Sequence, residues 1–221
     1  GQDVIYKSQI RREGLAFNSF YLAEWAGVNV ADGSPMWYDS LGNVTKDYAK
    51  ARKIIAGNAD PKFIFSLGNT FTIGDVSISF SFYAKYGNKV YNNIDEILVS
   101  DGAFANLNQS TKALDRWQKP GDVTDVPKLV YNNSSNSNQT STRYLVDGSY
   151  VKLQNVSVSY EIPILWVQKM KLSSVSIFIQ GQNLWTWTYF PGIDAEQNIR
   201  GVSWFRYPNS RSVTGGINIK I

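Results

Sequence analysis

Apolar and polar residues alternate with a period of two along several stretches of this chain. In residues 63–73 the odd positions are mainly apolar, and in residues 76–83 the even positions are apolar, with serine or tyrosine between them. Such alternation predicts strands that have one apolar face. Gly74 and Asp75 separate the two runs and predict a tight hairpin, because glycine allows the positive φ of a primed turn.

The same pattern, followed along the whole chain, predicts about six long strands. They cover residues 19–28, 62–73, 75–86, 149–160, 174–184 and 211–221, with a shorter strand at 4–10. Arms of about 11 residues match the roughly 9 to 11 residues that a tilted strand needs to cross the hydrocarbon core of a bilayer. The expected fold class is therefore all-β.

The connections between these strands alternate in length. Short connections follow residues 73 and 160, and long ones span residues 29–61, 87–148 and 190–210. Bacterial outer-membrane barrels have short periplasmic turns and long extracellular loops. We therefore predict a segment of an antiparallel transmembrane β-barrel, with extracellular loops in these three ranges and a periplasmic C-terminus. A soluble β-sandwich, whose strands also alternate, is the alternative.

The short connection at 163–172 has a pattern of its own. It begins with proline, which is favoured at the first position of a helix. We expect one or two helical turns there, at the periplasmic rim of the barrel.

The apolar positions of the alternating runs are the candidates for contact with lipid, because barrel strands turn every second side chain outward. These candidates are Phe65, Leu67, Val76, Ile78, Phe80, Phe82, Ile177, Ile217 and Ile219. The serine, glutamine and asparagine residues between them would face the lumen.

The amino-acid composition excludes several kinds of site and several classes of function. Only 43% of the residues are hydrophobic, and no run approaches the roughly 18 apolar residues of a membrane-spanning helix. The chain has no cysteine and no histidine, which excludes disulfides, thiolate or imidazole metal sites and triads with a histidine base. The 22 basic and 18 acidic residues are scattered, so no nucleic-acid-binding patch is predicted. The sequence begins at Gly1 without a leader pattern, and we expect it to be mature, processed or partial.

The predicted loops contain aromatic residues that could contact a substrate or a capping protein, because flat rings with polar edges suit sugars and peptides. The candidates are Trp37, Tyr38, Trp117, Trp204, Phe205 and Tyr207. For each of them, packing of the loops against one another is the alternative.

The asparagine- and serine-rich stretch 132–142 predicts a flexible, solvated loop. Carboxylates in the loops lack the number and spacing of calcium ligands, and no catalytic arrangement is apparent, so we predict no metal, no cofactor and no enzymatic activity.

Four motifs in the second half of the chain stand out. They are Asp-Arg-Trp at 115–117, Thr-Asp-Val-Pro at 124–127, Arg-Tyr-Leu-Val-Asp-Gly-Ser-Tyr-Val-Lys-Leu at 143–153 and Gly-Gln-Asn-Leu-Trp-Thr-Trp at 181–187. In order and spacing they resemble the C-terminal quarter of the SusC/RagA family of TonB-dependent outer-membrane transporters. Shorter matches at 19–21, 25–28, 60–63 and 86–92 extend the resemblance over nearly the whole chain.

The resemblance implies a 22-stranded barrel that holds an N-terminal plug domain. About six strands cannot enclose a plug, so we expect this chain to be a C-terminal piece of a larger barrel. Its last strand keeps the family's barrel-insertion signal at Thr214, Gly216, Ile219 and Ile221, with Ile221 where the family commonly has phenylalanine. A second departure is at 191–196, which keeps the acidic residues of a Gly-Tyr-Asp-Pro-Glu element but lacks its tyrosine and its proline.

The resemblance also implies a function, the active import of a glycan or an oligopeptide across the outer membrane of a Gram-negative bacterium. The expected partners are the remainder of the barrel with its plug, a SusD-like surface lipoprotein over the loops, TonB acting through the absent N-terminal part, and outer-membrane lipid. Two alternatives remain open, a soluble β-sandwich that binds carbohydrate and a porin that allows passive diffusion.

Overall fold

The computed structural model describes residues 2–104 and 106–221, which form two compact units. The sheet unit contains residues 61–87, 148–196 and 207–221. The loop unit contains residues 2–60, residues 88–147 apart from 105, and residues 197–206. Each unit therefore gathers segments that lie far apart in the sequence.

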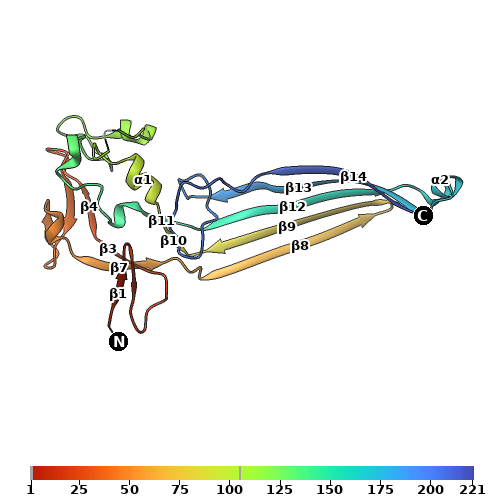
Figure 1. Ribbon diagram of the computed structural model, residues 1–221, viewed down its shortest axis with the longest axis horizontal. Helices are drawn as coiled ribbons and strands as arrows, with labels where there is room; N and C mark the ends of the chain where they lie inside the picture. Colours follow the sequence, from red (N-terminus) through yellow and green to blue (C-terminus); the bar gives the residue numbers. More distant parts are fainter. Residues whose placement is uncertain (1, 105) are drawn as a thin grey trace. The chain divides into compact units, whose positions relative to one another are not determined.

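Five long antiparallel strands make up the sheet unit (Figure 1). They are β8 (Phe63–Ile73), β9 (Val76–Tyr86), β12 (Tyr150–Glu161), β13 (Ser174–Thr188) and β14 (Ser212–Lys220), in the spatial order β14-β13-β12-β9-β8. Their β-branched and aromatic residues suit a pleated surface. The last five of the expected long strands are thus confirmed, with β13 reaching four residues beyond its expected end.

An irregularity in β12 keeps its apolar residues on one face. Leu153 and Val156 are three residues apart, so regular alternation would turn them to opposite faces. Between Leu153 and Asn155 the pairing of β12 shifts register with both neighbours. Gln154 is an extra residue relative to β9, whereas two residues of β13, Asn183 and Leu184, lie opposite it. This bulge returns Val156 to the face that carries Leu153.

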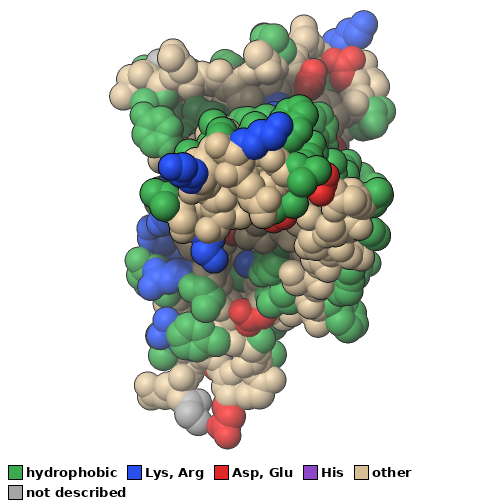
Figure 2. All heavy atoms as spheres, turned by 90° about the vertical axis from the view of Figure 1, so that its right-hand side faces the viewer, with side chains coloured by type: hydrophobic (Ala, Val, Ile, Leu, Met, Phe, Trp, Pro, Cys, Tyr) green, Lys and Arg blue, Asp and Glu red, His purple; other side chains and the backbone are tan. Residues whose placement is uncertain are grey.

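The short connections lie at one end of the sheet (Figure 1). There, Gly74 adopts a φ of 59° in the two-residue turn between β8 and β9. The expected short helix is confirmed as α2 (Ile164–Lys169), with Pro163 as its N-cap. The backbone N–H of Ser173 donates to the carbonyl of Lys220, so the C-terminal end of β14 lies at the same end of the sheet. Figure 2 looks onto this end and shows hydrophobic side chains with lysine or arginine side chains beside them.

The loop unit contains nine short strands in three small sheets, together with short helices. The sheets are β1 (Val4–Tyr6), β2 (Gln9–Arg11), β3 (Ser19–Ala23) and β7 (Lys53–Asn58); β4 (Trp25–Val28), β5 (Pro35–Tyr38) and β6 (Val44–Thr45); and β10 (Lys89–Tyr91) with β11 (Leu145–Asp147). The helices are α1 (Asn93–Leu98) and the 3-10 turns η1 (Tyr48–Lys50), η2 (Thr111–Asp115), η3 (Tyr131–Asn133) and η4 (Thr142–Tyr144). Two of the stretches expected as long loops, 29–61 and 87–148, therefore contain short strands and helical turns, whereas 190–210 contains neither a helix nor a strand.

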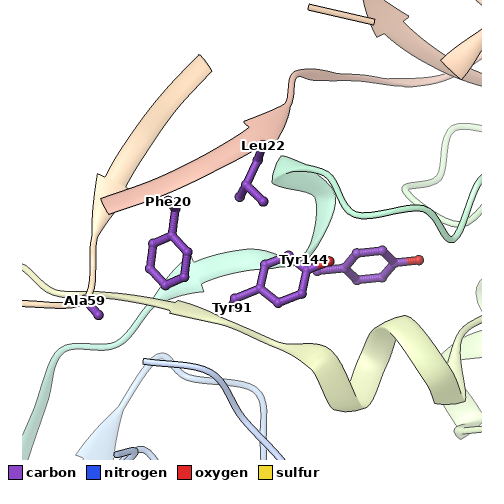
Figure 3. Packing of buried hydrophobic residues seen from close by; sticks show 5 residues of the cluster. All are labelled: Phe20, Leu22, Ala59, Tyr91 and Tyr144. Atoms are coloured by element: carbon purple, nitrogen blue, oxygen red, sulfur yellow. The ribbon is translucent and has the colours of Figure 1, made fainter. Parts of the chain in front are cut away.

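A small apolar cluster lies at the centre of the loop unit. It consists of Phe20, Leu22, Ala59, Tyr91 and Tyr144 (Figure 3). The rings of Tyr91 and Tyr144 meet edge to face, with centroids 6.3 Å apart, a favourable arrangement for aromatic pairs. The cluster joins β3 to β10 and to the end of η4, and so holds together segments more than 100 residues apart.

The expectation of a long strand at 19–28 is wrong, and the described chain has five long strands rather than six. The segment divides at Glu24, because its N–H donates to Arg52 and its carbonyl accepts from Tyr38. As a result β3 pairs with β7, whereas β4 pairs with β5. No helix in the described part of the chain is long and apolar enough to cross a membrane.

Candidate functional site

The long sheet has two chemically different faces. Directly opposed residues of antiparallel strands point to the same face, and Val158 lies opposite both Ile78 and Ile179. Followed across all five strands, the register brings every residue predicted to face lipid to one face, namely Phe65, Leu67, Val76, Ile78, Phe80, Phe82, Ile177, Ile217 and Ile219. No second sheet belongs to the described part of this unit.

Hydroxyl and amide side chains occupy the other face. Ser79 lies opposite Thr70 and Ser157, and Gln180 lies opposite Ser157 and Thr214. Such groups can hydrogen-bond to water or to a polar ligand. The polar face could therefore line an aqueous lumen.

The connection between β13 and β14 is fastened to this polar face. Lys152 of β12 has a side chain only 5% exposed and forms an ion pair with Glu196. Glu196 also accepts from the amide of Asn209 at 2.8 Å, and Asp194 accepts from the N–H of Asn209 at 3.0 Å. A polar pocket of about 330 Å³ lies beside these groups, and Thr186 and Asp194 are among its lining residues. The two acidic residues noted at 191–196 thus order this connection.

The predicted insertion signal lies on β14. Thr214 and Gly216 are on the polar face and Ile219 is on the apolar face, while Ile221 follows the strand. A Cβ at Gly216 would approach the ring of Phe178 to 2.7 Å. Glycine at this position therefore makes room for a neighbouring aromatic ring.

Three of the aromatic candidates pack within the loop unit. Trp37 is fully buried, and its ring meets Trp25 and Tyr48 edge to face. Trp37 has no surface to offer a ligand, and the structure removes it from the candidates. The guanidinium of Arg52 lies over the ring of Tyr38, 5.6 Å from the ring centroid.

Trp117 fastens one loop to another. Its indole N–H donates to the carbonyl of Val30 at 3.0 Å. Its ring packs on Gly33, where a Cβ would lie 2.5 Å from the ring. The alternative of packing between loops therefore describes Trp117.

The other aromatic candidates are open to solvent. Trp204 and Phe205 of the loop unit are 41% and 57% exposed, and Tyr207 of the sheet unit is fully exposed. Trp204 also lines a pocket of about 590 Å³ in the loop unit, together with Tyr6 and Lys7 of the β1–β2 hairpin. Lys7 lies over the Trp204 ring, 5.4 Å from its centroid, within cation–π range.

One carboxyl group faces this pocket, that of Glu96 in α1. Glu96 accepts a hydrogen bond of 2.5 Å from the hydroxyl of Tyr91. Burial raises the pKa of Glu96, and the hydrogen bond from Tyr91 offsets this only in part. The carboxyl is therefore already engaged by a hydrogen bond within the unit.

The stretch 132–142 is not the flexible solvated loop that its composition suggested. Asn133, Ser137 and Ser141 are buried. Ser137 donates to the carboxylate of Asp101 at 2.6 Å, and Asp101 forms a buried ion pair with Arg143 at 2.5 Å. Asn133 and Ser137 thus find hydrogen-bond partners inside the unit, which composition alone could not reveal.

Sequence reasoning missed the basic residues around the large pocket. Lys7, Arg200 and Arg206 all line it, although nearly 200 positions separate the first from the others. Each is an isolated charge in the sequence, so only the fold brings them together. Within the described residues, no cluster of acidic side chains could hold a metal ion.

Comparison with known proteins places the chain among outer-membrane receptors. It is 30% identical over 97% of its length to TonB-dependent receptor P3 of Formosa agariphila, and 27% identical over 85% to TonB-dependent receptor P26 of the same organism. The chain spans only 23% and 19% of these two relatives. No protein-family model matches the chain.

Solved structures agree with the sequence relatives. The fold is similar to a chain of the RagAB peptide importer in its closed-closed state, with a TM-score of 0.83 and 26% identity over 97% of this chain and 24% of that one. The open-open state gives a TM-score of 0.81 at 25% identity, with 99% of this chain and 24% of that one covered. The resemblance drawn from the motifs is thereby confirmed, and the chain is a SusC/RagA-like segment of a TonB-dependent receptor.

Proposed function

We propose that this chain supplies part of the barrel wall and of the extracellular loops of an importer in the outer membrane. The observation that carries the proposal is the long sheet, in which five antiparallel strands share one apolar face and one polar face. Strands of 9 to 15 residues have the length to cross a bilayer when tilted. Lipid would contact the apolar face, and the polar face would line the lumen.

The orientation follows from the connections. The turn at Gly74, the α2 connection and the C-terminus would be periplasmic, because periplasmic turns of such barrels are short. The long connections would be extracellular. In this arrangement Thr214, Gly216, Ile219 and Ile221 would present the insertion signal to the periplasmic assembly machinery. An open edge in lipid would leave backbone groups unsatisfied, so neighbouring strands of the whole receptor would pair with β8 and β14.

The whole receptor would take up a large nutrient, a glycan or an oligopeptide, with energy delivered through TonB. The similarity to the RagAB peptide importer supports an oligopeptide and a surface lipoprotein that pairs with the loops. Trp204, Phe205 and Tyr207 would be available for such contacts, because all three are exposed. Catalysis is no part of this function.

Uptake by cells that carry the full receptor would test the proposal. We expect labelled oligopeptide or glycan to accumulate in cells with intact TonB, and accumulation to stop when tonB is deleted or the proton gradient is collapsed. Uptake that persists without TonB would instead support a passive porin. Recovery of the receptor in the soluble fraction after carbonate washing of the membranes would refute a barrel of any kind.

A further inference from the structure

Two pockets of the loop unit adjoin along the β1–β2 hairpin. The larger, of about 590 Å³, and a second of about 310 Å³ share Tyr6, Gln9 and Arg200 as lining residues. The side chain of Gln9 donates to the carbonyl of Arg200 at 2.8 Å, which ties the hairpin to the segment 198–206. We call the two pockets together the basic groove.

Positive charge exceeds negative charge in this groove. Among its lining residues are the cations Lys7, Arg11, Arg200 and Arg206, none of which has a carboxylate within ion-pair distance among the described residues. By contrast, Arg12 of the same hairpin region pairs with Asp3 at 2.6 Å. The second pocket has no acidic lining residue, and the single carboxyl group of the first is engaged by Tyr91. Lys7 interacts with Glu96 through its charge, but four cations beside one carboxyl group leave an excess of positive charge, which attracts an anionic ligand.

Within the described residues, the outer backbone edge of the hairpin is unpaired. β1 is the outermost strand of its sheet, and among the described residues no strand pairs with its outer side. Val4 pairs with Arg11 and Tyr6 pairs with Gln9, so these four side chains share one face and line the second pocket. An extended peptide can add to such an edge through main-chain hydrogen bonds, while its alternate side chains enter pockets on one face. A glycan has no regular series of N–H and C=O groups to match this edge.

We infer that the basic groove binds an acidic peptide in extended conformation, along the outer edge of β1 and with its carboxylates directed at Arg11, Arg200 and Arg206. The inference rests on the proposed import function and deepens it, since it assigns the receptor a preference for anionic oligopeptides. Tyr6 and Trp204 would cover the apolar parts of the peptide.

Binding to the purified full receptor in detergent tests this inference without requiring transport. The probe is an acetylated and amidated octapeptide of alternating serine and glutamate, compared with the same peptide carrying glutamine in place of glutamate. We expect the glutamate peptide to bind at least about tenfold more tightly in calorimetry, and this advantage to shrink as sodium chloride rises from 50 to 500 mM, because salt screens exposed charges.

Variants identify the site. The double substitution Arg200→Gln with Arg206→Gln should weaken binding of the glutamate peptide by about tenfold, whereas its effect on the glutamine peptide should be small. Lys119→Gln with Lys128→Gln removes the same charge from residues that line neither pocket, and should change the affinity by less than about twofold. All four side chains are at least partly exposed, so loss of folding is not expected.

Three results would overturn the inference. The first is equal affinity for the glutamate and glutamine peptides. The second is an equal loss of affinity in both double variants, which would indicate attraction by net charge alone. The third is tighter binding of tetragalacturonate, an acidic glycan of equal charge, through the same arginines. None of these results would affect TonB-dependent uptake, which the preceding experiment measures separately.

Discussion

The loop unit and the sheet unit treat polar and apolar residues in opposite ways. In the loop unit, charged and amide groups such as Asp101, Asn92 and Asn133 are buried, and a small aromatic cluster holds the segments together. In the sheet unit, Phe65, Ile217 and other large apolar residues are more than half exposed. The loop unit therefore carries its own interior, whereas the sheet unit needs an apolar environment to cover one face.

Breaking the buried ion pair gives the largest expected effect on this contrast. Asp101→Asn leaves Arg143, whose side chain is 6% exposed, without its countercharge. Removing one partner of a buried pair costs about 3 to 5 kcal/mol. We expect faster hydrogen exchange across residues 93–104 and 131–147 of the full receptor, measured by mass spectrometry.

The exposed pair Arg12–Asp3 provides the control. Its side chains are 46% and 38% exposed, and such pairs contribute at most about 1 kcal/mol. Asp3→Asn should therefore leave exchange nearly unchanged. If the two variants behaved alike, the loop unit would not depend on buried polar contacts.

The sheet unit should respond instead to the face that is changed. Ile78→Arg places a charge on the apolar face near the middle of β9, which costs about 2 to 4 kcal/mol when that face meets lipid. Ser79→Arg places the same charge on the polar face and should cost little. The amount of folded receptor in outer-membrane fractions measures both effects. In a detergent gel, the folded form is recognised by its altered mobility in samples that have not been heated. Equal amounts of the two folded variants would contradict the assignment of the faces.

The long strands could be predicted from sequence because apolar and polar residues alternate along them with a period of two. The exception, 19–28, has the pattern of a strand but changes partners at Glu24. That change depends on hydrogen bonds to Arg52 and Tyr38, which are distant in sequence. No local pattern encodes such a change.

The burial of residues in the loop unit could not be predicted, for a related reason. A buried serine such as Ser137 and an exposed one have the same local composition, and contacts such as the hydrogen bond to Asp101, 36 positions away, distinguish them. Likewise Trp37 and Trp204 look alike as loop aromatics, but one is fully buried and the other is 41% exposed. Burial in this unit is decided by contacts between distant segments.

Two glycines with positive φ sharpen the comparison on a smaller scale. Gly102 of the loop unit has a φ of 97°, and a Cβ there would lie 2.2 Å from the carbonyl oxygen of Val130. Gly74 of the sheet unit has a φ of 59° and open space around it. Gly102→Ala adds overlap to backbone strain and should cost about 2 to 3 kcal/mol, whereas Gly74→Ala adds only the strain, about 1 kcal/mol. Hydrogen exchange of each unit, measured in the full receptor as urea is increased, compares the two variants. If the loop unit were loosely packed, Gly74→Ala would be the more destabilising substitution.

The smallest expected effect is a dependence on pH in the loop unit. Because burial raises the pKa of Glu96 above its unfolded value of 4.5, the folded state holds this proton to a higher pH than the unfolded state. The stability that this group contributes is therefore fully present below pH 4.5 and declines as pH rises through its folded-state pKa. Glu96→Gln removes the decline and keeps an oxygen to accept from Tyr91, so protection of α1 at pH 8 should increase slightly, by less than about 1 kcal/mol for this partly exposed group.

Asp32 provides a control of opposite sign. The hydrogen bond from Lys46 lowers its pKa to about 2, so its contribution is present above pH 3.8 and is lost as the pH falls toward 2. Asp32→Asn should therefore decrease local protection at pH 8, whereas Glu96→Gln increases it. Exchange at pH 4 and pH 8, corrected for intrinsic rates, measures both. If protection at pH 8 decreased in both variants, the hydrogen bond from Tyr91 to an ionised Glu96 would outweigh the cost of burying that charge. The loop unit would then accept a buried anion at Glu96 as readily as it does at Asp101.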